Sequence, residues 1–188
     1  RGSFRSFPIE YLVNQTKKLV EGGVKEIILV AQETTLYGVD LYGKKSLPKL
    51  LHNLGLIEGL EWIRILYCYP EEINDELIEA IKNEPKVCHY LDMPIQHASD
   101  NILKRMGRRT SKQELTDIVA KLRREIPDIA LRTTLITGFP GETDVDHEEV
   151  MQFIDECEFD RLGVVTYSRE EETVAAQMPD QIDEEIKE

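Results

Sequence analysis

ALRTTLITGFPGET, residues 130–143, and YLDMPIQHASDNILKRMGR, residues 90–108, are the two stretches that decide the fold. Each runs from an apolar strand pattern into a polar turn that contains glycine or proline, and then into the start of a helix. Parallel α/β folds place their ligand sites where strands end in this way. We therefore expect the chemistry of this chain at the carboxyl ends of its strands.

The rest of the chain repeats the alternation of strand and helix. Helical spacing of apolar residues follows Pro8, Ser46, Asn74 and the capping-box pair Ser111 and Glu114. Short apolar runs predict strands at residues 26–31, 61–67, 87–93, 129–137 and 161–167. A further helical pattern ends at Cys157 and precedes the last strand. Strands separated by helices predict right-handed βαβ units in one parallel sheet.

The fold class expected is α/β, a partial (βα) barrel of the TIM type. The first strand contains IILVA, which is apolar on both faces, so we expect both faces to be covered. A barrel of this type would begin with a strand, whereas this chain opens with a helical pattern after Pro8. We therefore expect one strand of the barrel to precede Arg1.

Composition limits the class of protein. The 188 residues are 41% apolar and 31% charged, which suits one ordinary hydrophobic core or part of a larger barrel. No run of about 18 apolar residues could span a bilayer, and the first residues show no signal-peptide pattern. We expect no membrane partner and a cytoplasmic location.

The formal net charge of −13 argues against direct nucleic-acid binding by this segment and is compatible with a basic protein partner. Residues 169–188 hold eight acids against Arg169 and Lys187, so we expect a solvated linker there. One cluster of basic residues consists of Lys104, Arg105, Arg108 and Arg109. It is either a solvated helix end, which is the commoner case, or a nucleic-acid patch.

The three cysteines, Cys68, Cys88 and Cys157, are separated by 20 and 69 residues. This spacing has neither the density of a disulfide framework nor the CxxC clustering of a local metal site. We expect small buried hydrophobic side chains, with a catalytic thiol as the weaker interpretation.

Several segments in series carry a resemblance to one family. They are RGSFRSFPIE, AQETTLYGVDLYGK, WIRILYCYP, YLDMPIQHASDNILKRMGRR, LRTTLITGFPGET and FDRLGVVTYSREE. In this order they resemble the central domain of the methylthiotransferases, a branch of the radical S-adenosylmethionine (SAM) enzymes. The resemblance covers nearly the whole chain, and it implies a radical SAM core.

Two segments distinguish the branches of that family. AQETTLYG and PIQHASD resemble the branch that adds a methylthio group to the β-carbon of an aspartate in the twelfth protein of the small ribosomal subunit. The tRNA-modifying branch has segments like QNVNAYG and QSGS instead. The resemblance thus implies a ribosomal protein substrate, with a tRNA adenosine as the alternative.

The same resemblance implies SAM and four-iron four-sulfur clusters as cofactors, and an electron donor protein as partner. The family holds its radical-generating cluster in a CxxxCxxC loop that ends just before the segment matched by Arg1 and Gly2. That motif does not occur in the 188 residues, and Cys68, Cys88 and Cys157 do not match its positions. By itself this chain is expected not to reduce SAM, and a catalytically silent scaffold remains a second interpretation.

The resemblance also implies the domain organisation. Residues 1–168 match a radical SAM core that lacks its first strand and cluster loop, and residues 169–188 resemble the linker towards a β-rich substrate-binding domain. One departure is Glu172, which stands where the family has glycine. A turn with positive φ is therefore in doubt at this position.

Five residues at strand ends are candidates to bind SAM. Gln32 ends the first strand and could hydrogen-bond the methionyl end, although it could equally cap its loop through Thr34. Gln96 follows Pro94 and is the better candidate beside His97, which is either a structural histidine or a ligand or proton carrier.

The remaining candidates come from LRTTLITGFPGET. Arg132 and Thr134 alternate with apolar residues, so they share a face, where Arg132 could bind a carboxylate or ribose or pair with a nearby acid. Gly138 permits close approach of the backbone to adenine, or it only forms a tight turn. Glu142 is expected at the start of the next helix.

Overall fold

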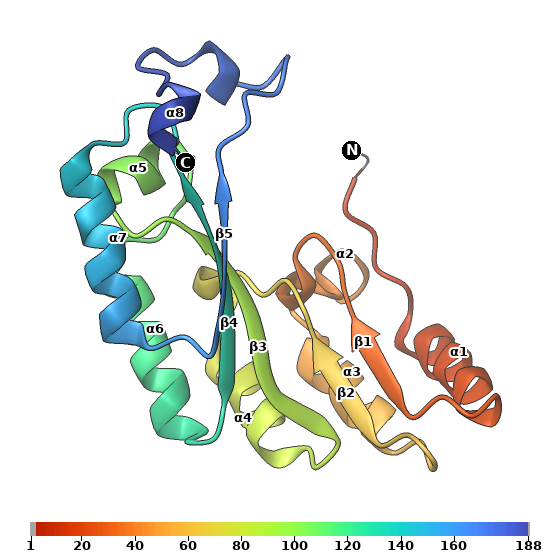
Figure 1. Ribbon diagram of the computed structural model, residues 1–188. Coiled ribbons are helices and arrows are strands. Elements are labelled where there is room, and N and C mark those ends of the chain that lie inside the picture. Colours follow the sequence, from red (N-terminus) through yellow and green to blue (C-terminus); the bar gives the residue numbers. More distant parts are fainter. Residues whose placement is uncertain (1–2, 188) are drawn as a thin grey trace. The chain divides into compact units, whose positions relative to one another are not determined.

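The computed structural model describes residues 3–187 and divides into two compact units (Figure 1). The first unit contains the chain up to Asp92 together with Leu122–Ala130. The second contains Met93–Lys121 and the chain from Leu131 onward. Each unit buries its own set of apolar side chains.

All the strands predicted from the sequence are present, with the bounds β1 Glu26–Leu29, β2 Trp62–Ile65, β3 Val87–Gln96, β4 Ala130–Thr137 and β5 Arg161–Thr166. Hydrogen bonds join them in the order β1-β2-β3-β4-β5, and the β1–β2, β2–β3 and β4–β5 pairs are parallel. Strand order follows chain order, as consecutive βα units require.

β3 extends beyond the predicted end at residue 93 and passes through Pro94 to Gln96. Proline lacks the backbone N–H that a sheet ladder uses. Thr133 of β4 compensates, because its hydroxyl donates to the Met93 carbonyl at 2.8 Å and accepts from the Ile95 N–H at 3.4 Å. A side chain of β4 thus bonds the backbone groups on both sides of Pro94.

The predicted helices are present, with the bounds α1 Ile9–Glu21, α3 Leu47–Gly55, α4 Asp75–Asn83, α5 Asp100–Arg105, α6 Lys112–Glu125 and α7 Asp144–Cys157. The described residues also form two short helices that the sequence did not predict, α2 Val39–Tyr42 and α8 Glu184–Lys187. The predicted cap of α4 is confirmed, since the Asn74 side chain accepts from the Leu77 N–H at 3.0 Å. The capping box of Ser111 and Glu114 is also present before α6. No helix within residues 3–187 has the length and apolar character that a membrane crossing needs.

The core of the first unit lies between its strands and helices α3 and α4. Leu51, Leu54 and Ile81 of these helices and Ile63 of β2 are fully buried. On β1, however, Ile28 is 53% exposed. The expectation that both faces of this strand are covered is therefore wrong for the described residues, because the helical layer packs on one face only.

In the second unit, Ile102, Phe139 and Tyr167 form a buried cluster. The rings of Phe139 and Tyr167 meet edge to face, with centroids 5.3 Å apart. This cluster joins α5, the turn after β4 and the end of β5. Residues 169–187 belong to the same compact unit, and Lys187 there is buried, with its Nζ donating to the Tyr167 carbonyl at 3.1 Å.

The loop after β5 keeps the turn that the sequence placed in doubt. Glu172 has a φ of 65°, so the left-handed backbone is retained without glycine. Two strand ends share this conformation: Tyr67 after β2 has a φ of 58°, and Gln96 at the end of β3 has a φ of 78°. Strained backbone of this kind clusters at functional sites.

Candidate functional site

In the first unit, a buried carboxylate organises the loop after β1. Gln32 is exposed in this loop, and the next residue, Glu33, is buried. The Glu33 carboxylate accepts from the backbone N–H of Thr35 at 2.9 Å and from that of Tyr69 at 3.1 Å. Burial outweighs these hydrogen bonds and raises the pKa of Glu33. The loop that carries Gln32 is thereby joined to the loop after β2.

Thr34 makes a second connection between the same two loops. Its hydroxyl donates to the Leu66 carbonyl at 2.6 Å, and its backbone N–H donates to the Tyr67 carbonyl at 2.9 Å. The hydroxyl also accepts from the Ala31 N–H at 3.2 Å. These contacts hold the left-handed backbone of Tyr67. Thr34 thus joins the loop after β1 to the loop after β2, and Gln32 is exposed beside it.

In the second unit, the end of β3 presents Gln96 half-buried, with its positive φ. Arg108 steadies this strand end, since its guanidinium donates to the Pro94 carbonyl at 2.6 Å. Arg105 of the same basic cluster lies 3.7 Å from Asp180. Arg105 and Arg108 therefore both contact groups of their own unit. These contacts favour the interpretation of the basic cluster as a helix end.

On β4, side chains alternate between the two faces as predicted. Leu131, Thr133 and Leu135 are buried, whereas Arg132 and Thr134 are half-buried on the opposite face. Gly163 of β5 pairs with Thr134 and provides the space beside them. A Cβ atom at Gly163 would lie 3.7 Å from Thr134 Oγ1 and 3.9 Å from an Arg132 guanidinium nitrogen. The prediction that Arg132 and Thr134 share a face is confirmed.

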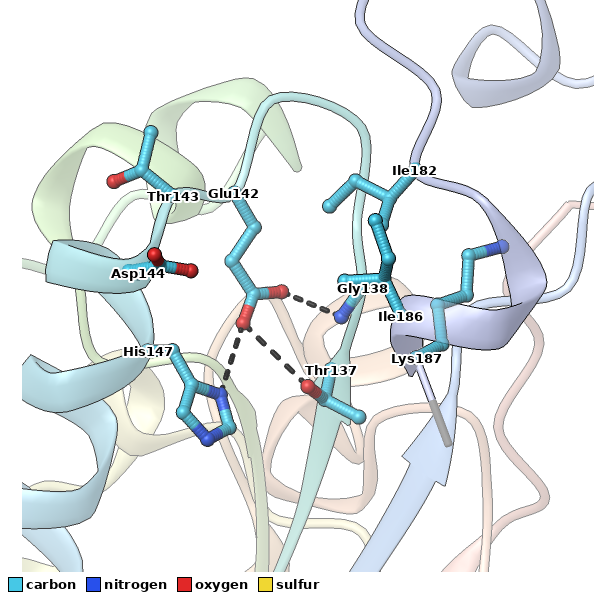
Figure 2. Close-up of a pocket in the computed structure, with 9 residues that line it drawn as sticks. All are labelled: Thr137, Gly138, Glu142, Thr143, Asp144, His147, Ile182, Ile186 and Lys187. Carbon is cyan, nitrogen blue, oxygen red and sulfur yellow. Dashed lines mark hydrogen bonds and ion pairs between the residues drawn. The ribbon is translucent and has the colours of Figure 1, made fainter.

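After β4, the side chain of Glu142 closes the GFPG turn (Figure 2). Its Oε2 accepts from the Gly138 N–H at 2.6 Å and from the Phe139 N–H at 3.1 Å. The Glu142 side chain is only 5% exposed. Gly138 has a φ of 74°, a left-handed conformation that glycine adopts without strain. Two amides of the turn are thus occupied by a carboxylate of the same chain.

Two histidines also approach this carboxylate. His97 Nε2 lies 3.7 Å and His147 Nδ1 lies 3.3 Å from Glu142 Oε1. Burial by itself would raise the pKa of Glu142, but His97 and the N–H groups of Phe139 and Gly138 favour the charged form, and the net pKa lies below its ordinary value. Glu142 is therefore a buried anion at neutral pH.

A pocket of about 300 Å³ opens beside this carboxylate, lined by Thr137, Gly138, Glu142 and His147 together with Lys187 (Figure 2). Its volume is at the lower end of the range for small-molecule sites. The first residues of α7 also line this pocket. Thr143 caps that helix in a capping box with Asp146. Asp146 also accepts a short hydrogen bond from the Ser99 hydroxyl, which ties the chain after β3 to α7.

Four of the five predicted SAM-contact residues belong to the second unit: Gln96, Arg132, Thr134 and Gly138. Gln32 belongs to the first unit. The roles of all five remain predictions. Sequence reasoning assigned no site role to Glu33 and placed Glu142 only at a helix start. The signal for both was an acid directly beside a strand-end turn, where backbone N–H groups need an acceptor.

The described residues include no group of three or more His, Cys, Asp or Glu side chains placed to hold a metal ion. Cys68 and Cys157 are buried and Cys88 is half-buried, and none of the three is in a disulfide. Burial raises the pKa of the Cys68 thiol. Cys68 and Cys157 thus match the expectation of small buried side chains.

Comparison with known proteins shows the family of the chain. Residues 1–154 match the model of the radical SAM superfamily. The whole chain is 67% identical to a protein of Lachnoclostridium phytofermentans named ribosomal protein uS12 methylthiotransferase RimO, and 58% identical to one of that name from Geobacter sulfurreducens. The chain spans 42% of the length of each of these relatives.

Solved structures share the fold at low sequence identity. Streptococcus suis SuiB, in a crystal structure bound to SAM, superposes with a TM-score of 0.63 at 14% identity over 97% of this chain and 39% of that one. The cobalamin-dependent SAM radical enzyme OxsB gives a TM-score of 0.64 at 15% identity, over 81% of this chain and 23% of its own. The parallel βα architecture is the one found in these enzymes, and the chain belongs to the radical SAM superfamily.

Proposed function

We propose that this chain is the central part of a radical SAM methylthiotransferase that modifies the β-carbon of an aspartate in ribosomal protein uS12. The observation that carries the proposal is identity over the complete chain to proteins with that printed name, 67% and 58% in two genera. The strand-end geometry supports it, because polar groups suited to a small charged cofactor gather on one unit.

Each proposed contact suits a different part of SAM. The guanidinium of Arg132 offers donors to the carboxylate or to ribose hydroxyls, with Thr134 beside it. The amide of Gln96 can both donate and accept hydrogen bonds, and Gln32, which belongs to the first unit, is proposed separately for the methionyl end. Gly138 would let adenine approach the backbone closely once the Lys187 side chain, which covers this glycine, moves away. One-electron cleavage of bound SAM, by a cluster held outside the described residues, would give methionine and a 5′-deoxyadenosyl radical able to remove a hydrogen atom from the aspartate β-carbon.

The described residues do not fit an iron–sulfur cluster. We propose that the cluster ligands, the contact with an electron donor protein and the substrate-binding domain lie in other parts of a longer protein, with residues 169–188 as the linker. The net charge of −13 supports a basic ribosomal protein rather than a nucleic acid as the partner of this segment. The proposed location is the cytoplasm.

The substrate assignment can be tested with the complete protein that carries this chain, after cluster reconstitution. Ribosomal protein uS12 and tRNA are incubated with it separately, with SAM and a reductant, and analysed by mass spectrometry. We expect one methylthio group on uS12. Methylthiolated tRNA with unmodified uS12 would overturn the branch assignment.

The cofactor assignment has its own test. Arg132→Gln removes the guanidinium from the proposed site, and we expect SAM affinity to fall about tenfold, as for loss of a charge-assisted hydrogen bond. Arg161→Gln is the matched control, since Arg161 pairs with Arg132 in the β4–β5 register and is exposed. Equal affinities for the two variants in calorimetric titration would contradict the role of Arg132.

A further inference from the structure

His97 is buried to 1% exposure at the end of β3, and its two ring nitrogens have different surroundings. Nδ1 accepts from the Ser99 backbone N–H at 3.0 Å. A nitrogen that accepts from an N–H carries no proton, so the proton of the neutral ring is on Nε2. The Ser99 contact therefore fixes the tautomer and makes Nε2 a donor.

That donor faces one acceptor. Nε2 makes no hydrogen bond within residues 3–187, and it lies 3.7 Å from Glu142 Oε1. This distance is only about 0.5 Å longer than the upper limit of about 3.2 Å for an N–H···O hydrogen bond. Buried donors rarely stay unpaired, because desolvation without a partner is costly. A small movement of either side chain would pair the last free N–H of His97 with the buried carboxylate.

The contact would connect two strand ends that carry proposed cofactor residues. His97 directly follows Gln96 on β3, and Glu142 holds the turn of Gly138 through the N–H groups of Gly138 and Phe139. His147 approaches the same oxygen from α7, but its side chain is 53% exposed. Of the two rings, only the buried one links β3 to the GFPG turn.

We propose that His97 is a positioning residue for SAM binding: its Nε2–H donates to Glu142 and so holds the strand end of Gln96 against the turn of Gly138. This inference rests on the proposed function for its ligand, while the contact itself concerns only the protein. A purely local role would need Nδ1 alone, for the Ser99 N–H. The two nitrogens can be separated by substitution.

His97→Gln places an amide nitrogen near the position of Nε2 and removes the acceptor for Ser99. His97→Asn keeps an acceptor near Nδ1 and removes the donor. In the complete protein with its clusters, we expect SAM affinity within about threefold of wild type for His97→Gln and about tenfold weaker for His97→Asn. The reverse order, or equal losses, would show a local role and overturn the proposal.

A second readout does not depend on SAM. Amide hydrogen exchange of Gly138 and Phe139 in the unliganded protein should accelerate about tenfold in His97→Asn and stay near wild type in His97→Gln. Unchanged exchange in both variants would overturn the positioning role. If the wild-type protein binds no SAM, the proposed function fails, but amide exchange still tests the contact between His97 and Glu142. His89→Asn is the control, since His89 lies on β3 and pairs with Asp128 at 2.7 Å.

Discussion

Glu142 Oε2 accepts a hydrogen bond from the backbone N–H of Gly138 at 2.6 Å, across a turn that the left-handed φ of Gly138 makes possible. A carboxylate in this position completes the hydrogen bonding of the turn after β4 and adds a buried negative charge. The hydrogen bonding of this strand end therefore depends on one side chain.

Glu142→Ala should destabilise the protein by about 1–3 kcal/mol, because the N–H groups of Gly138 and Phe139 lose a buried acceptor. Glu148→Ala is the matched control on the exposed side of α7, and its effect should be within about 0.5 kcal/mol. Chemical denaturation of both variants measures the difference. Equal stabilities would show that water replaces the carboxylate at no cost.

Stability should fall on acidification partly through Glu142. Its folded pKa lies below the ordinary value of 4.5, so its contribution is complete above about pH 4.5 and is lost as pH falls through the folded pKa. Glu142→Gln cannot titrate, and its unfolding free energy should depend less on pH below this value. Parallel pH profiles for wild type and variant, from urea titrations, would contradict the assignment.

Gln96→Gly should stabilise the fold and weaken SAM binding at the same time. Glycine relieves the φ of 78°, a gain of up to about 1 kcal/mol, while the amide is lost. Glu158→Gly is the control, because Glu158 has a φ of 48° at the carboxyl end of α7. It should stabilise similarly and leave SAM affinity unchanged. Thermal unfolding and calorimetry separate these effects, and unaltered affinity in Gln96→Gly would exclude a role for its side chain.

Gly138→Ala should cost about 1–2 kcal/mol, since a left-handed φ of 74° strains any Cβ. The added atom would also lie 2.5 Å from Lys187 Cγ, so that side chain must move. Gly163 has no positive φ, and a Cβ added there would meet no atom closer than 3.7 Å. Gly163→Ala should therefore change the free energy of unfolding by no more than about 0.5 kcal/mol. Denaturation midpoints of the two variants compare them directly, and similar values would mean that the turn relaxes.

Much of the fold could be predicted because its signals are local. Hydrophobic spacing located every strand, and the caps at Asn74 and Ser111 lie within one helical turn of their partners. The prediction for β1 was wrong because burial of Ile28 depends on what packs against the strand, which its own sequence does not specify. The end of β3 was placed too early, because the support that Thr133 gives to Pro94 comes from another strand.

The sequence by itself determined the alternation of strands and helices, the shared face of Arg132 and Thr134, and the family, since periodicity and motifs are properties of neighbouring residues. Only the tertiary structure decided that Glu142 is a buried anion, that Gln96 has a left-handed backbone, and that the protonated nitrogen of His97 faces a carboxylate. Each of these depends on desolvation and on contacts between distant segments, and such contacts exist only once the chain is folded.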